Sequence, residues 1–215
     1  MTETADATNT ATEVGTQTVD FWFDSVCPFA WITSRWMLEV EKVRPIRVNW
    51  HIMSLSVLNE HQNLDEDYRS MLDRAWLPAR AATQIQERHG NEAIGAFYTA
   101  VGTRIHNEGQ KDFEAAVRGA LEELGLETEE ILAAARTDVL DEALRASHAE
   151  GIEKVGDDVG TPVVSFNGTA FFGPVMTRIP RGEEAGRIFD AAVTLAGFPY
   201  FYEIKRSRTT SPQFD

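Results

Sequence analysis

The positions of hydrophobic residues predict a strand, a helix and a second strand at the start of the chain. Residues Val19–Asp24 form a short aromatic-rich run that ends in Asp24-Ser25, which is typical of a buried strand. Residues 30–43 repeat apolar side chains at helical spacing until Pro45 ends the helix. Residues 46–55 then alternate apolar and polar side chains, which predicts a second strand. We expect the two strands to be parallel, with a right-handed crossover between them.

The middle of the chain, from residue 59 to residue 155, has almost only helical patterns. Pro78 suggests a kink inside the first of these helices, and Gly125 is well placed to end another. The expected helices cover residues 65–82, 93–105, 113–124, 128–135 and a longer segment from 137 to 151 or 155.

Strand patterns return later in the chain as two short segments joined by Asn167-Gly168, a dipeptide typical of a type I′ hairpin. A final helix should follow, and the aromatic run at residues 198–202 should pack back on the core. The chain after Arg206 is polar. The two strands are expected over residues 162–167 and 169–172, and the helix over residues 182–196.

The order of these elements is β-α-β, a block of helices, then β-β-α. Strand–helix–strand and hairpin–helix are the two halves of a thioredoxin-type fold, so we expect an α/β fold of this type with a large all-helical insertion. The predicted parts are a disordered tail (1–18), a thioredoxin-like domain (19–58 and 156–204), a helical subdomain (59–155) and a C-terminal tail (205–215).

Composition narrows the classes of partner. The chain has 215 residues and a formal net charge of −14, which disfavours nucleic acid and anionic membranes as partners. It has no apolar stretch of the roughly 18–20 residues that span a bilayer. The first residues lack the basic and apolar regions of a secretory signal. A single cysteine suits a reducing compartment, so we expect a cytoplasmic protein.

The only cysteine, Cys27, lies where the first strand gives way to the first helix, in the run Cys27-Pro28-Phe29-Ala30. Backbone N–H groups at a helix N-terminus favour a thiolate, and such thiols have pKa values of about 3.5–7.5 against about 8.5 for a free thiol. The other interpretation of a lone cysteine is a buried, inert side chain. Ala30 occupies the position where a Cys-x-x-Cys redox site has its second thiol. Any thiol chemistry here must therefore use a single cysteine of the chain.

The layout and two motifs resemble the DsbA-like thioredoxin-fold family. The motifs are Phe21-Trp22-Phe23-Asp24 leading into Cys27-Pro28-Phe29-Ala30-Trp31, and Val159-Gly160-Thr161-Pro162-Val163. Further stretches resemble an actinobacterial branch of mycothiol-dependent oxidoreductases and nitroreductases, of which this chain would be a monothiol variant. These stretches are Trp31–Trp36, His51–Leu55, Arg104–Asn107, Ala170–Pro174 and Ile179–Glu184.

The resemblance implies a site and a co-substrate. The Thr161-Pro162 peptide would be cis and would face the Cys27 thiol. The protein would bind no cofactor tightly and would use mycothiol, or a similar small thiol, to resolve an adduct on Cys27. Its substrates would be mixed disulfides or small electrophiles such as nitro compounds, and a homodimer is plausible.

Three more residues are candidates for the lining of this site. Asp24 can assist proton transfer or simply hold the turn before Cys27. Trp31 can line an apolar groove or belong to the core, and the resemblance alone places His106 near the site. None of the five histidines has metal-ligand spacing with the cysteine, so we expect no metal.

Two other functions remain open. One is a kappa-type thiol transferase or isomerase, in which the active-site residue binds the thiol without becoming oxidised. The other is a binding module that has lost redox activity. A covalent adduct on Cys27 would separate both from a monothiol oxidoreductase.

Overall fold

The computed structural model describes residues 16–215, and within them a mixed sheet has the strand order β2-β1-β3-β4. Strands β1 (Gln17–Phe23) and β2 (Ile46–Ile52) are parallel, as predicted, with Phe21 opposite Trp50. Strands β3 (Val163–Phe166) and β4 (Thr169–Phe172) add an antiparallel hairpin beside β1. The sheet thus joins two strands from the start of the described chain to a hairpin from its last third, and the helical block lies between them in sequence.

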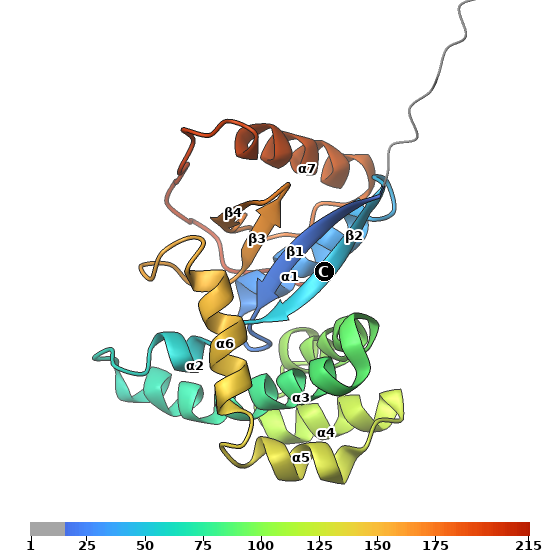
Figure 1. Cartoon of the computed structure of the whole chain (residues 1–215), viewed down its shortest axis with the longest axis vertical. Coiled ribbons are helices and arrows are strands. Elements are labelled where there is room, and N and C mark those ends of the chain that lie inside the picture. The colour runs from blue at the N-terminus through green and yellow to red at the C-terminus, as the bar shows by residue number, and fades with distance from the viewer. Residues whose placement is uncertain (1–15) are drawn as a thin grey trace, which may run out of the picture.

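Figure 1 shows α3, α4 and α5 gathered at one end of the sheet, with α6 leading back toward it. Helix α7 lies on the opposite side of the molecule from this group. A π-helical turn, η1 (Thr103–Asn107), follows α3. The helices are α1 (Pro28–Val40), α2 (Leu55–Leu58), α3 (Glu66–Gly102), α4 (Phe113–Leu124), α5 (Thr128–Ala135), α6 (Asp141–Ile152) and α7 (Gly182–Ala196).

Alternating side chains of β1 face two separate apolar clusters. Phe21 and Phe23 belong to the main core, which α1 and α7 also enter. On that face the indole Nε1 of Trp36 donates to the carbonyl oxygen of Ala185 at 3.0 Å and so joins α1 to α7. Trp22 points to the other face, where it packs with Met53 in a smaller cluster that the end of α6 covers.

Side chains from the helices occupy the outer edge of β2. Glu41 accepts from the N–H of Val48 at 2.8 Å, and Asn91 of α3 accepts from the N–H of Trp50 at 2.7 Å. The Ser147 hydroxyl group of α6 accepts from the N–H of Ile52 at 3.2 Å and donates to the carbonyl oxygen of Ile52 at 2.8 Å. These bonds satisfy backbone groups of an edge strand that would otherwise be free to pair with a strand of another chain. They also fasten the helical block to the sheet.

Several predicted elements are confirmed in detail. Helices α4, α5 and α7 have the predicted bounds, and α4 ends at Gly125 in the left-handed conformation with φ 65°. Asn167 and Gly168 both have positive φ, as a type I′ turn requires. The Asp112 carboxylate caps the start of α4 by accepting from Ala115 N–H.

Other predictions need correction. The helix continues through Pro78 and is instead interrupted at Gly90, whose φ of 77° is not helical. The segments predicted over residues 65–82 and 93–105 therefore belong to α3, with the last residues forming η1. Strand β2 stops at Ile52, because the Ser54 side chain caps α2. Helix α6 begins at residue 141 rather than 137.

The aromatic run 198–202 does not pack back on the core as predicted. Phe198, Tyr200 and Tyr202 are 60, 74 and 79% exposed. Phe201 alone of this run reaches another part of the fold, where its ring lies 5.7 Å from that of Phe171 in β4. The run follows α7 over the surface, so hydrophobic composition misled the prediction.

The predicted tail over residues 1–18 falls mostly on residues 1–15, which lie outside the described part of the chain. Gln17 and Thr18 belong to β1 instead. The division into a thioredoxin-like domain and a helical subdomain stays a prediction. Within residues 16–215, no helix has the length and apolar character needed to cross a membrane.

Gly102 allows α3 to approach the active-site helix, and its replacement tests this packing. A Cβ at this position would lie 2.2 Å from Cζ3 of Trp31. Gly102→Ala should therefore lower the free energy of unfolding by about 1–3 kcal/mol through overpacking, although alanine favours a helix by roughly 0.5–1 kcal/mol. Urea unfolding measures the change.

Gly197→Ala is the matched control, because the nearest atoms beyond its chain neighbours would be backbone oxygens 3.5 Å from the new Cβ. We expect the control to unfold within about 0.5 kcal/mol of the parent. Equal stability of the two variants would contradict the close approach at Trp31.

Candidate active site

Cys27 is the N-cap residue of α1, as the sequence suggested. Pro28 fills the first helical position, where the missing N–H costs nothing. The Sγ atom accepts a hydrogen bond from the N–H of Ala30 at 3.4 Å and donates to the carbonyl oxygen of Thr161 at 3.4 Å. The thiol therefore lies between the active-site helix and a loop 134 residues away in sequence.

The Thr161-Pro162 peptide is cis and leads directly into β3. This is the conformation that the family resemblance implies. Because β3 pairs with β1, the loop before β3 reaches the turn after β1, where Cys27 lies. The Thr161 Oγ1 atom is buried and has no hydrogen-bond partner within the described residues. Its interaction with the sulfur lowers the pKa of Cys27, so this hydroxyl group is available to a thiolate.

Asp24 anchors the turn that carries the thiol. Its carboxylate oxygens accept from the N–H of Val26 at 2.9 Å and from the N–H of Leu55 at 2.7 Å. The side chain is fully buried, and this burial raises the pKa of Asp24 from 3.8 to about 6 despite the two hydrogen bonds. The geometry thus shows the turn-holding role directly, while a role in proton transfer stays a prediction.

His106 and Trp31 come together between the turn before Cys27 and the helix after it. His106 Nε2 lies 2.9 Å from the carbonyl oxygen of Ser25, so this nitrogen carries the proton. Burial lowers the pKa of His106 to about 4, which keeps the ring neutral. The ring stacks on Trp31 with centroids 5.6 Å apart, and Trp31 Nε1 donates to the Asn107 side chain at 3.1 Å. Turn η1 therefore touches both the loop before Cys27 and the helix after it.

The expected lowering of the Cys27 pKa is not found. The residue is only 5% exposed, and burial raises the pKa of the thiol above its ordinary value. The Thr161 side chain and the N–H of Ala30 act in the opposite direction but have smaller effects, and the Asp24 charge raises the pKa further. The thiol does lie at a helix N-terminus, as the sequence predicted. The loss of solvation on burial raises its pKa by more than the helix N-terminus lowers it in this conformation.

Tyr68 is a neighbour of the site that the sequence reading missed. It lies in the first turn of α3, which the Asp65 side chain caps. Burial raises the pKa of Tyr68, and the charges of Asp24 and Cys27 raise it further. The sequence presented Tyr68 only as one apolar position of a helix, and no local pattern linked it to a thiol distant in sequence.

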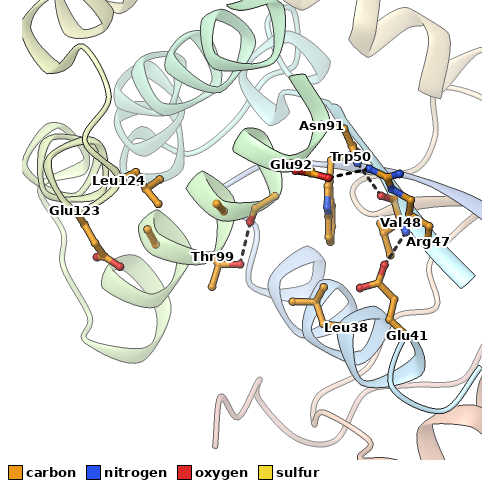
Figure 2. Close-up of a pocket in the computed structure, with 13 residues that line it drawn as sticks. Leu38, Glu41, Arg47, Val48, Trp50, Asn91, Glu92, Thr99, Glu123 and Leu124 are labelled. Carbon is orange, nitrogen blue, oxygen red and sulfur yellow. Dashed lines mark hydrogen bonds and ion pairs between the residues drawn. The ribbon is translucent and has the colours of Figure 1, made fainter. Parts of the chain in front are cut away.

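The pocket in Figure 2 lies away from the thiol. It has a volume of about 530 Å³ and is bordered by Leu38 of α1, Val48 and Trp50 of β2, and Thr99 of α3. None of the predicted site residues lines it. Across residues 16–215, no group of three or more His, Cys, Asp or Glu side chains is placed to hold a metal ion.

Comparison with models of protein families shows which family the chain belongs to. The model of the Rv2466c-like family, described as mycothiol-dependent nitroreductase Rv2466c, matches residues 26–206. The chain belongs to the Rv2466c-like family. The match includes Cys27 and the Thr161-Pro162 loop, which together form the site described above.

Other proteins are similar to this member of the Rv2466c-like family. The uncharacterized protein Rv2286c of Mycobacterium tuberculosis is 29% identical over 193 residues, which are 89% of this chain and 83% of that protein.

Solved structures of low sequence identity share the fold. A 2-hydroxychromene-2-carboxylate isomerase has a TM-score of 0.56 at 14% identity and covers 84% of this chain and 95% of its own. DsbA from Xylella fastidiosa has a TM-score of 0.53 at 17% identity, and the match covers 84% of this chain and 86% of that chain. The cytosolic disulfide reductase DsbM from Pseudomonas aeruginosa, solved with GSH, has a TM-score of 0.53 at 16% identity. The match covers 83% of this chain and 100% of that chain. The expected DsbA-like thioredoxin fold is thereby confirmed. Membership of the family supports a thiol-dependent oxidoreductase.

The raised pKa of Asp24 gives a pH-dependent prediction. The folded protein holds this proton more tightly than the unfolded chain does, so Asp24 reduces stability as pH rises from about 4 to about 6. The free energy of unfolding of the parent, minus that of Asp24→Asn, should fall by up to roughly 3 kcal/mol across this range. Urea unfolding of both proteins at several pH values measures the difference. A difference that stays constant or grows with pH would contradict the burial of an ionisable Asp24.

Proposed function

We propose that the protein is a monothiol oxidoreductase that reduces mixed disulfides or small electrophiles with an external low-molecular-weight thiol. The observation that carries the proposal is the position of Cys27. Its sulfur caps α1 and faces Thr161, and the sequence contains no second cysteine. Family membership supports mycothiol as the thiol, and a reducing compartment such as the cytoplasm would supply it.

The proposed cycle has two exchange steps. The Cys27 thiolate attacks one sulfur of a mixed disulfide R–S–S–R′. A new disulfide, Cys27 Sγ–S–R, forms, and R′–S⁻ leaves and takes up a proton. A thiolate from solution then attacks the sulfur of the R group in this adduct. That step frees Cys27 as a thiolate and releases R joined to the external thiol. The substrate is reduced, and the external thiol is oxidised.

The same thiols can also supply the electrons and protons needed to reduce a nitro compound. Two electrons and two protons convert a nitro group to a nitroso group and water. Cys27 and one external thiol supply them by forming a mixed disulfide, and a second external thiol then frees Cys27 by exchange.

Residues around the sulfur have separate proposed roles. The Thr161 hydroxyl group donates to the thiolate once it forms, because it is buried beside the sulfur without another partner in the described chain. Asp24 holds the turn, and its negative charge disfavours the thiolate form of Cys27. Phe29 and His106, both half-buried, provide the aromatic wall against which a ligand packs, and the buried Trp31 supports His106 from behind.

Intact-mass measurement tests the covalent step. Incubation with oxidised mycothiol should add one thiol adduct to the protein, and free mycothiol should remove it. Cys27→Ser should gain no mass. Noncovalent binding of mycothiol without an adduct would contradict the proposal and favour a transferase or isomerase, and the absence of both would favour a redox-inactive binding module.

Ala30→Cys tests the monothiol character by restoring the second thiol of a Cys-x-x-Cys site. The introduced thiol should attack the Cys27 adduct from within the chain, so the adduct should not accumulate. Mass spectrometry should instead show an internal disulfide that is two hydrogens lighter. Persistence of the adduct in this variant would show that the two positions are not arranged for exchange.

A further inference from the structure

The last residues of the chain, 207–215, form an irregular segment that we call the C-terminal strap. One side of the strap is attached to the loop after β4. The N–H of Gln213 donates to the carbonyl oxygen of Thr177 at 2.8 Å, and the hydroxyl groups of Thr210 and Thr177 lie 2.9 Å apart. The family match ends at residue 206, so the strap lies outside it.

The other contacts of the strap are with residues of the active site. The Arg208 guanidinium lies 4.7 Å from the centre of the Phe29 ring, within the Cys27-Pro28-Phe29-Ala30 motif. The Phe214 ring lies 5.5 Å from that of His106, and the Phe214 carbonyl oxygen accepts from Asn107 Nδ2 at 2.7 Å. The strap therefore joins the loop after β4 to turn η1 beside the active-site helix.

These contacts continue to the immediate surroundings of the thiol. His106, which stacks on Phe214, donates to the carbonyl oxygen of Ser25 in the turn before Cys27. Asn107, which binds the backbone of Phe214, also accepts from Trp31 in the helix after Cys27. Phe214 thus contacts two residues, His106 and Asn107, each of which directly contacts a segment next to Cys27.

Cys27 needs a more open arrangement to react. Thiol–disulfide exchange requires the thiolate to approach a disulfide sulfur directly, but this side chain is 5% exposed. Burial also disfavours the thiolate in the present arrangement. Some part of the surroundings must move before a substrate reaches the sulfur.

The strap is the element best suited to move. Most of its residues are exposed, and Pro212 and Phe214 alone within it are half-buried. Its polar and cation–π contacts are at the surface, where such contacts are individually weak. Ordering an irregular segment also costs backbone entropy that opposes docking. Release of the strap therefore costs little free energy, although the docked state predominates.

We propose that the C-terminal strap docks reversibly across Phe29, His106 and Asn107, closes the active site, and exposes Cys27 when it is released. The surface beside the thiol is thus a docking site for this segment of the same chain. A substrate or thiol that binds there competes with the strap. The inference rests on the proposed function for the identity of Cys27 as the reacting thiol.

Alkylation of Cys27 by iodoacetamide tests the proposal, since it reports access to the thiol and needs no mycothiol. In a variant ending at Arg206, the second-order rate constant at neutral pH should rise about tenfold or more, because the accessible state is then the major one. A synthetic peptide of residues 207–215 added in trans should slow the reaction again. Circular dichroism checks that the shortened chain is folded.

Phe214→Ala in the full chain gives a second, milder test that does not depend on the truncation. It should raise the rate constant severalfold, because it removes the contact with His106. Ser211→Ala is the matched control, since Ser211 is exposed and its side chain makes no hydrogen bond in the described structure. The control should react at the parental rate.

The outcomes separate the strap from the proposed function. Equal alkylation rates for the parent and folded Phe214→Ala, or a folded truncated chain that is no faster, would overturn the strap as a closing element. Faster alkylation in these variants without any adduct from oxidised mycothiol would support the strap and contradict the proposed redox cycle.

Discussion

The sulfur of Cys27 is held between two parts of the chain, and the rest of the site is arranged around this contact. It caps α1 through Ala30 N–H and donates to the Thr161 carbonyl oxygen. Both contacts depend on the sheet, because the pairing of β1 with β3 brings the turn before α1 to the loop before β3. The same enclosure removes the thiol from water, and desolvation then outweighs the helix N-terminus in setting its pKa. The structure thus shows a thiol that is well positioned but held in its protonated form.

Turn η1 connects this thiol to the helical block. A π-helical turn is uncommon and often marks a functional position in a helix. Here it directs His106 to the carbonyl oxygen of Ser25 and Asn107 to Trp31, while Gly102 just before it lets α3 approach the indole. Movement of the helical block relative to the sheet would therefore change the surroundings of Cys27 at once. The helical block is thus in contact with both segments that hold the thiol.

The sequence was sufficient for features set by local chemistry. Helix α4 was predicted with its bounds and with Gly125 at its end, and the position of Cys27 before Pro28 indicated a place near an N-cap. Features set by distant contacts could not be predicted from local chemistry. The family resemblance alone placed the Thr161-Pro162 loop opposite Cys27, and the polar appearance of the C-terminal strap concealed the contact of Phe214 with His106. The helix interruption at Gly90 rather than Pro78 was likewise not decided by local propensity.

The central claim is that the resting protein keeps Cys27 protonated by burial, even though the thiol caps a helix. Thiolate absorbance near 240 nm, followed as a function of pH for the parent and subtracted for Cys27→Ser, measures this directly. We predict a midpoint above that of a free thiol. A midpoint below that of a free thiol, about 8.5, would show that the helix N-terminus dominates and would contradict the account.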